Sequence, residues 1–177
     1  MSLIEKLIQQ IEEHNLWNPP IVLRRNEYLD VHGKVDTKLY FVISGSVRIY
    51  VVDQEEEQVV RFGYRDSFFA VLDSFLNNQP SDYYVQAIKE TELVSISKDA
   101  FMALVNSSED NLKGWQMALE LLVLQQLERE RDILTSSPKE RYLRVLKRSP
   151  QLFQEIPNKH IASYLRMTPE TLSRMKK

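Results

Sequence analysis

Residues 108–134 read SEDNLKGWQMALELLVLQQLERERDIL, and seven of the eight residues in 117–124 are apolar. Apolar side chains would face every side of a helix formed here, so one neighbour cannot cover them all. At 1.5 Å per residue, about 25 residues make a helix roughly 37 Å long. We therefore expect a long helix that is buried on more than one face. Its polar end, 128–132, indicates that burial stops before Leu134.

The expected helix carries two apolar faces. One stripe near the helical period is formed by Leu112, Trp115, Leu119, Leu122 and Leu127. The second face is formed by Ala118, Leu121 and Leu124. One interpretation is a single core helix. The interpretation that we favour packs one stripe on its own domain and the other on a second copy of the chain. Contact between the copies is assigned to Leu112, Trp115, Leu119 and Leu122.

Composition sets the class of protein. A chain of 177 residues with 43% hydrophobic and 27% charged residues is long enough for one or two globular domains. It contains no cysteine, which excludes disulfides and metal or iron–sulfur sites held by thiolates. The first residues lack a signal-peptide pattern, and no apolar run is long enough to cross a membrane. We expect a cytoplasmic protein that does not contact membranes and has no cofactor.

The charge is divided unevenly along the chain. Residues 138–177 contain ten Lys/Arg and three Asp/Glu, a net charge of +7, while the preceding 137 residues contain 13 and 22, a net charge of −9. An acidic body followed by a basic segment suggests that the basic segment binds a polyanion. A basic surface that is simply solvated would have the same composition.

The spacing of apolar residues changes within the first hundred residues, from a helical period to a strand period. Residues 2–13 place Leu3, Leu7 and Ile11 on one helical face, which predicts a short amphipathic helix. In residues 16–97, apolar and polar residues then alternate with a period of two in short runs separated by turn signals, which predicts a sandwich or jelly roll. The expected strands cover 21–23, 28–31, 39–43, 47–52, 59–62, 83–88 and 93–96.

Short local signals predict turns and helix starts. Gly45 lies between two strand patterns and is expected to adopt a positive φ. A helix is predicted over 98–105, and Ser107 or Ser108 is expected to cap the long helix. In the basic segment, Ser137, followed by proline and then by Glu140, has the pattern of a capping box for a helix that runs toward Arg148.

The last twenty residues have a helix-turn-helix pattern. Helices are predicted over 158–165 and from Pro169 to at least Met175, with Thr168 as the cap of the second. The expected inward positions are Ile161, Ala162, Leu165, Met167, Leu172 and Met175. Arg166 occupies the turn position at which glycine would be unstrained, and the departure costs on the order of 1 kcal/mol. The pattern is typical of proteins whose second helix enters the major groove of DNA.

The second helix would present a polar face to DNA. Glu170 can accept a hydrogen bond from cytosine and Arg174 can pair with guanine, each contributing about 1–3 kcal/mol of discrimination. The alternative is a surface ion pair between these two residues. The predicted DNA-binding residues are Lys159, Thr168, Pro169, Glu170, Ser173, Arg174, Lys176 and Lys177.

The order of these elements resembles the Crp/Fnr family of bacterial transcription factors. Residues 39–48 look like that family's strand-turn-strand segment, and residues 169–174 resemble its recognition helix. The resemblance implies an α+β fold with an N-terminal double-stranded β-helix (jelly-roll, cyclic-nucleotide-binding-like) domain over 1–107, a dimerisation helix over 108–136 and a helix-turn-helix domain over 137–177. It further implies a homodimer that binds a two-fold site in double-stranded DNA, is controlled by a small-molecule effector and acts with RNA polymerase.

The sequence departs from this family at the phosphate cassette. Ser81 stands where the resemblance places a phosphate-binding arginine, and Asp82 follows it. A carboxylate repels a phosphate, so cyclic AMP is not the expected effector. The effector pocket is instead assigned to Phe68, Phe69, Ser81, Asp82, Tyr83 and Tyr84, although the aromatic residues among them are equally consistent with core packing.

A second departure from the family is length. The family's DNA-binding domain usually continues into a β-hairpin wing, so a chain that ends at Lys177 is expected to bind DNA less tightly.

Other functions fit the residues less well. A metal enzyme on a jelly roll needs converging histidines, whereas His14, His32 and His160 are far apart in the sequence. The alternative that remains is a ligand-binding or dimerising module with a vestigial DNA-binding tail.

Overall fold

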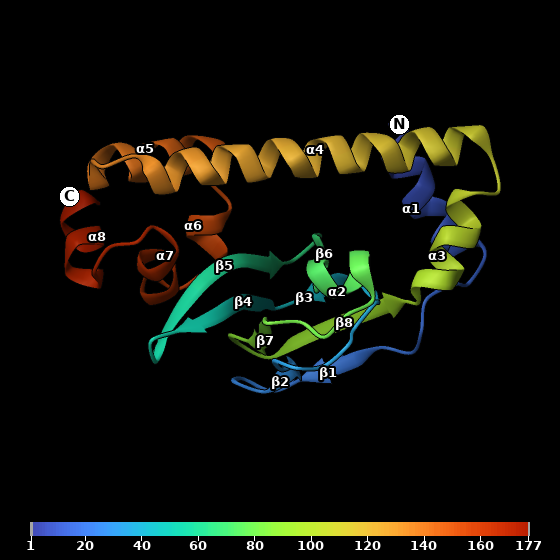
Figure 1. Cartoon of the computed structure of the whole chain (residues 1–177), viewed down its shortest axis with the longest axis horizontal. Helices are drawn as coiled ribbons and strands as arrows, with labels where there is room; N and C mark the ends of the chain where they lie inside the picture. Colours follow the sequence, from blue (N-terminus) through green and yellow to red (C-terminus); the bar gives the residue numbers. More distant parts are fainter. Residues whose placement is uncertain (1, 177) are drawn as a thin grey trace.

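The long helix α4 lies along one side of the molecule in this computed structural model, which describes residues 2–176. Figure 1 shows α1 and α3 at one end of α4, helices α5 to α8 at the other, and the strands between them. The helices are α1 (Leu3–Glu13), α2 (Leu72–Asn77), α3 (Lys98–Val105), α4 (Glu109–Leu134), α5 (Pro138–Arg148), α6 (Leu152–Glu155), α7 (Asn158–Tyr164) and α8 (Pro169–Met175). None of these helices, within residues 2–176, is long and apolar enough to cross a membrane.

The strands form a β-roll of two four-stranded antiparallel sheets. Their bounds are β1 (Ile21–Leu23), β2 (Tyr28–Asp30), β3 (Leu39–Ser44), β4 (Ser46–Asp53), β5 (Glu56–Tyr64), β6 (Phe68–Ala70), β7 (Tyr84–Ala87) and β8 (Thr91–Ile96). One sheet has the order β1-β8-β3-β6 and the other β2-β7-β4-β5. Alternating residues fill the space between them, with Val42, Val47, Val85 and Leu93 fully buried. The predicted mixture of a β-roll with several helices is confirmed.

Gly45 links β3 to β4, and so to the other sheet. Its φ is +89°, and a Cβ there would lie 2.5 Å from Cα of Thr91. Only glycine combines this backbone conformation with so close an approach. The predicted role of Gly45 is confirmed.

The N-terminal half of α4 packs on its own chain. Trp115 lies edge-on to Phe101, with ring centroids 5.2 Å apart, and to Phe75 at 6.3 Å. Edge-to-face pairs contribute about 0.5–1.5 kcal/mol beyond the area that they bury. Gly114 lets α1 approach closely, because a Cβ would lie 2.9 Å from the carbonyl oxygen of Leu3. The predicted packing of α4 on its own domain therefore occurs through Trp115, and the prediction that Trp115 contacts a second copy is corrected.

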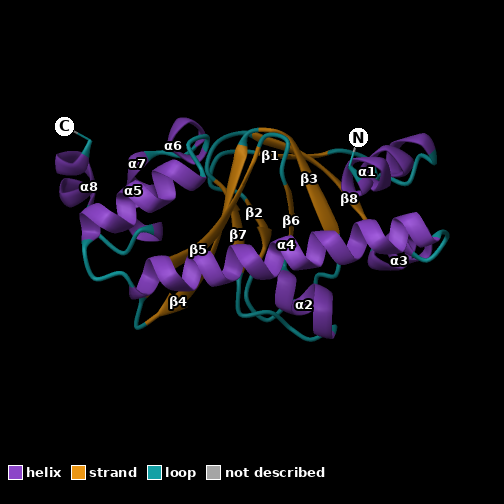
Figure 2. Cartoon of the chain, turned by 90° about the horizontal axis from the view of Figure 1, so that it is seen from above, coloured by secondary structure: helices purple, strands orange, loops and turns teal. Residues whose placement is uncertain are grey.

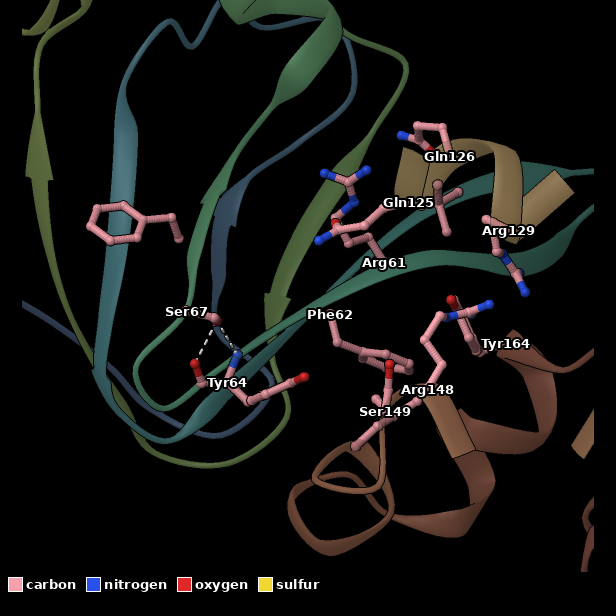
Figure 3. Close-up of a pocket in the computed structure, with 13 residues that line it drawn as sticks. Arg61, Phe62, Tyr64, Ser67, Gln125, Gln126, Arg129, Arg148, Ser149 and Tyr164 are labelled. Carbon is pink, nitrogen blue, oxygen red and sulfur yellow. Dashed lines mark hydrogen bonds between the residues drawn. The ribbon is translucent and has the colours of Figure 1, made fainter. Parts of the chain in front are cut away.

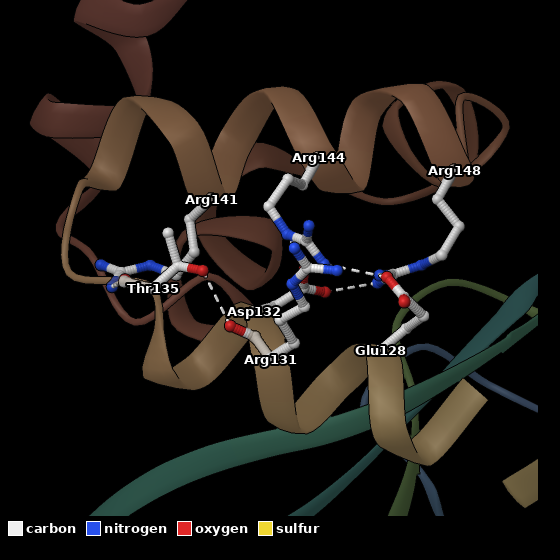
Figure 4. Close-up of polar contacts among 7 residues, drawn as sticks. All are labelled: Glu128, Arg131, Asp132, Thr135, Arg141, Arg144 and Arg148. Carbon is white, nitrogen blue, oxygen red and sulfur yellow. Dashed lines mark hydrogen bonds and ion pairs between the residues drawn. The ribbon is translucent and has the colours of Figure 1, made fainter. Parts of the chain in front are cut away.

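The C-terminal half of α4 is joined to α5 by buried charges (Figure 4). Asp132 is fully buried, and its two carboxylate oxygens accept hydrogen bonds from Arg144 Nε at 3.0 Å and Arg148 Nη2 at 2.6 Å. Glu128, which is partly exposed, accepts from Arg144 at 2.9 Å. Burial of α4 stops before Leu134, as predicted, because Ile133 and Leu134 are exposed. Within the charged run 128–132, however, α5 covers Asp132 and the β-roll approaches Arg129.

Helices α5 to α8, called here the C-terminal helices, are docked on the β-roll. Val59 and Phe62 of β5 share one apolar cluster with Ile161 and Leu165. The rings of Phe62 and Tyr164 lie 5.5 Å apart. Viewed from above, α4 passes beside both the strands and this helical group (Figure 2). The contact between α7 and β5 therefore fixes how the C-terminal helices sit against the β-roll.

Candidate functional site

Helices α7 and α8 are held together by a tight turn. Arg166 in the turn has a φ of +54°, the left-handed conformation predicted for it. The Thr168 hydroxyl accepts a hydrogen bond from the N–H of Thr171 at 3.2 Å, and Pro169 follows at the first helical position. Leu172 on α8 is fully buried against the partners that the sequence predicted, Ile161, Ala162 and Leu165.

The outer face of α8 is polar and accessible. Pro169, Glu170, Ser173 and Arg174 are all exposed. Glu170 lies in the first turn, where a hydrogen bond to a backbone N–H and then one to Thr168 lower its pKa, so the side chain is ionised at neutral pH.

The remaining residues assigned to DNA contact are spread around α8. Lys159 on α7 is exposed, and Lys176 donates a hydrogen bond to the side chain of Asn158. Thr168 acts as the cap described above. Lys177 lies outside the described residues. The structure thus brings Lys159, Lys176 and the exposed face of α8 to the same end of the molecule.

The six residues assigned to an effector pocket do not share one pocket. Phe69 is buried against Tyr40, with ring centroids 5.1 Å apart, whereas Phe68 points the other way and packs near Phe41. Tyr84 stacks on Tyr50 at 5.2 Å, while Tyr83 packs against the core of the β-roll. The prediction is corrected because neighbouring strand residues point to opposite faces of a sheet.

The position expected to hold a phosphate is already occupied by protein groups. Ser81 is buried, and its hydroxyl donates to the Asp73 carboxylate at 2.9 Å. Asp82 is almost fully exposed, 3.4 Å from His32. Two carboxylates therefore lie beside the site where the resemblance places an arginine, which gives this site a negative potential.

A different pocket lies between the β-roll, α4 and the C-terminal helices (Figure 3). Its volume is about 430 Å³, a size that suits a small organic ligand. Its lining residues come from β5, β6 and the turn between them, from α4, and from the segment that runs from the end of α5 to the end of α7. They are Val60, Arg61, Phe62, Tyr64, Ser67, Phe68, Gln125, Gln126, Arg129, Arg148, Ser149, Leu152 and Tyr164. Of the six residues assigned to the effector, Phe68 lines this pocket.

Three arginines line this interdomain pocket, and no aspartate or glutamate is among its described lining residues. Arg148 is paired with Asp132. Arg129 stacks over the ring of Tyr164 at 3.7 Å and donates a long hydrogen bond of 3.4 Å to the carbonyl of Val59. Sequence reasoning missed Arg61 and Arg129, although an arginine inside a strand of otherwise apolar residues was a usable signal.

His160 on α7 lies half-buried at the contact with the β-roll. Burial lowers its pKa to about 4, and the positive charges of Arg48, Lys159 and Arg25 act in the same direction, while Glu57 opposes them. Arg48 is itself paired with Glu57, whose backbone carbonyl also accepts a hydrogen bond from Ser163 at 3.3 Å. The docked arrangement therefore favours the neutral imidazole.

We expect the stability of the protein to decrease on acidification because of His160. The imidazole has a pKa of about 6.5 when unfolded, so its contribution is complete above about pH 6.5 and is lost as the pH falls toward 4. Urea midpoints measured at about pH 7 and pH 5 should differ less in His160→Gln than in the unchanged protein. His14→Gln, at an exposed histidine, is the control. If the difference between the two urea midpoints in His160→Gln equals that of the unchanged protein, His160 is not the group responsible for the loss of stability.

Comparison with known proteins gives the family. Residues 20–108 match the cyclic nucleotide-binding domain. The catabolite activator protein of Thermus thermophilus is 19% identical, with a TM-score of 0.59 over 99% of this chain and 85% of that one. FixK2 from Bradyrhizobium japonicum is 19% identical, with a TM-score of 0.70 over 89% and 82%. A mutant of CooA from Carboxydothermus hydrogenoformans is 15% identical, with a TM-score of 0.71 over 99% and 83%.

The comparison with curated protein sequences gave no match. The solved structures extend the likeness from the β-roll through α4 into the C-terminal helices, since two of the three cover nearly the whole chain. The matched domain accounts for half of the residues. The chain therefore belongs to the cyclic nucleotide-binding domain family and has the fold of the Crp/Fnr regulators.

Proposed function

We propose that this chain is a transcriptional regulator that binds a two-fold DNA site as a homodimer. The observation that carries the proposal is the polar outer face of α8, where Glu170, Ser173 and Arg174 are exposed on a helix whose inner face is fully buried. Helices α7 and α8 would then form a helix-turn-helix, with α8 in the major groove. The net charge of +7 in 138–177 suits a polyanionic partner.

Domain roles follow from this proposal. Residues 1–107 form the sensor, 108–136 the linking and dimerising helix, and 137–177 the DNA-binding domain. The similar structures named above include a catabolite activator protein, which supports regulation of transcription. RNA polymerase is the expected further partner of such a regulator.

Helix α4 provides the surface for a second copy. Leu121, Val123, Leu124 and Leu127 are all about half exposed and lie on the side of α4 away from the β-roll, unlike Trp115. Trp115 was one of four residues that the sequence assigned to the dimer contact. Of the remaining three, Leu112 is exposed, whereas Leu119 and Leu122 are half-buried. A parallel pair of α4 helices would cover the exposed stripe and place two copies of α8 symmetrically.

The proposal is tested by selecting genomic fragments with the purified protein at about 150 mM salt and measuring each recovered site by fluorescence anisotropy. Recovery of a two-fold symmetric sequence supports a dimeric regulator. Binding that is sensitive to salt but indifferent to sequence would instead favour a ligand-binding or dimerising module with a weak DNA-binding tail.

Two substitutions in the protein, each measured on the selected DNA site, should distinguish a contact to a base from a contact to a phosphate. Arg174→Ala is expected to weaken binding by about 1–3 kcal/mol and to relax the preference at one base pair, because a bidentate contact to guanine is lost. Lys176→Ala should weaken binding to all sequences equally and reduce the salt slope by about 1. Anisotropy titrations against single-base variants of the site measure both effects. Equal losses on all sequences for Arg174→Ala would exclude its base contact.

Cyclic AMP is expected not to be the effector. About 1 mM of the nucleotide should leave the melting temperature unchanged, because Asp73 and Asp82 flank the position at which a phosphate would need a positive charge. Differential scanning fluorimetry with and without the nucleotide measures the effect. A clear rise in the melting temperature would contradict the expectation.

A further inference from the structure

The interdomain pocket contains positive charge that the protein does not neutralise. Arg148 is compensated by Asp132 and Glu128. Arg61 and Arg129 have no carboxylate within ion-pair distance in the part of the chain that the structure describes. Two guanidinium groups therefore face one cavity without an ion-pair partner among the described residues.

Arg129 is buried at a cost. Only 8% of the residue is exposed, and its Nη1 has no hydrogen-bond partner within residues 2–176. Its guanidinium carbon lies 3.7 Å from the centre of the Tyr164 ring, so a cation–π contact stands in place of an ion pair. A buried charged donor without a partner is unfavourable unless another group supplies the missing interaction.

Arg61, on the other side of the pocket, also has a guanidinium without an ion-pair partner among the described residues. It belongs to β5 and is half-buried, and its side chain makes no hydrogen bond or ion pair with any residue of the described chain. Burial lowers its pKa, and the groups that act in the opposite direction are the tyrosines Tyr164 and Tyr83, not a carboxylate. Figure 3 shows its guanidinium near Gln125 and Gln126 of α4, whose amides add uncharged hydrogen-bonding groups.

We propose that this pocket binds a small organic anion whose carboxylate or phosphate group pairs with Arg61, in the positive potential of Arg129. The apolar part of the ligand lies against Phe62, Phe68 and Leu152, which line the same cavity. The volume of about 430 Å³ accommodates such a molecule. The site is distinct from the phosphate position at Ser81, which is closed by its hydrogen bond to Asp73.

The position of the pocket links ligand binding to the arrangement of the C-terminal helices. Arg61 belongs to the β-roll, Arg129 to α4, and Arg148 and Tyr164 to the C-terminal helices. A ligand that contacts all three parts stabilises the docked arrangement and so changes how α8 is presented. This consequence for DNA binding rests on the proposed function, whereas the binding site itself does not.

Calorimetric titration with three probes tests the site without DNA. The probes are inorganic phosphate, phenyl phosphate and benzoate, added to the full chain. Arg61→Gln removes the proposed contact, and Arg65→Gln, at an exposed arginine four residues away, is the matched control. A charged hydrogen bond is lost in the first variant only, so its affinity for the probe should fall about tenfold to hundredfold.

The three probes also distinguish the two possible head groups. Tighter binding of phenyl phosphate than of inorganic phosphate, lost in Arg61→Gln and kept in Arg65→Gln, supports the proposal with a phosphate ligand. Binding of benzoate with the same dependence on Arg61 supports it with a carboxylate ligand. Equal losses in both variants, or no heat from any probe, overturns it.

The unliganded variant provides a second measurement. A binding role for Arg61 predicts that Arg61→Gln keeps or raises the melting temperature without a probe, because a half-buried charge without an ion-pair partner is removed. A marked fall would show that Arg61 is needed for folding and would overturn the proposal. Failure of the titration and failure of the DNA selection are distinguishable, since each is measured without the other.

Discussion

Asp132→Asn is expected to lower the free energy of unfolding by about 3–5 kcal/mol, the cost of breaking a buried ion pair by removing one partner. The Asp132 side chain has no exposed surface and joins α4 to two arginines of α5. An amide of the same shape removes the negative charge and turns an N–H₂ group toward a guanidinium, so that donors face donors. Urea unfolding followed by far-ultraviolet circular dichroism measures the loss.

Glu128→Gln is the matched control for this prediction. Glu128 belongs to the same cluster, but 46% of its side chain is exposed. Ion pairs exposed to solvent contribute at most about 1 kcal/mol, so this variant should unfold close to the unchanged protein. Equal effects from the two substitutions would mean that the buried carboxylate is not what secures α5 to α4.

Leu124→Asp combined with Leu127→Asp is expected to convert the proposed dimer into a monomer. These two leucines are 57% and 55% exposed in the single chain, and a second copy of α4 would bury them. Carboxylates placed in an apolar contact must lose their water without gaining a partner. Affinity for a two-fold DNA site should then fall on the order of a hundredfold, because the second half-site no longer benefits from linkage to the first.

Light scattering and DNA anisotropy measure the two parts of this prediction. Val22→Asp is the control, since Val22 is 60% exposed but lies on β1 of the β-roll. It should leave both the molecular mass and the DNA affinity unchanged. A double variant that remains dimeric would exclude this stripe of α4 as the interface and with it the proposed placement of the two α8 helices.

Helix starts were predicted to within one residue where a cap is encoded locally, with Ser137 and Thr168 as single candidates and Ser108 as one of two. Ser97, Ser108, Ser137 and Thr168 each accept a hydrogen bond from the backbone three residues later. Such bonds depend only on neighbours in the sequence. The short elements β6, α2 and α6 were not predicted, because three to six residues without a cap or a clear period give too weak a pattern.

The exposed face of α8 was likewise predictable, because helical spacing alone puts Glu170 and Arg174 opposite the buried Leu172. The interdomain pocket was not. The Arg129 guanidinium contacts the carbonyl of Val59, 70 positions earlier, and an arginine within the charged run 128–132 carries no local sign of burial. The sequence by itself therefore specified the order of the elements, their caps and their outward faces, since these depend on local geometry. Packing between β5, α4 and the C-terminal helices determined which charged groups became buried and around which cavity they met.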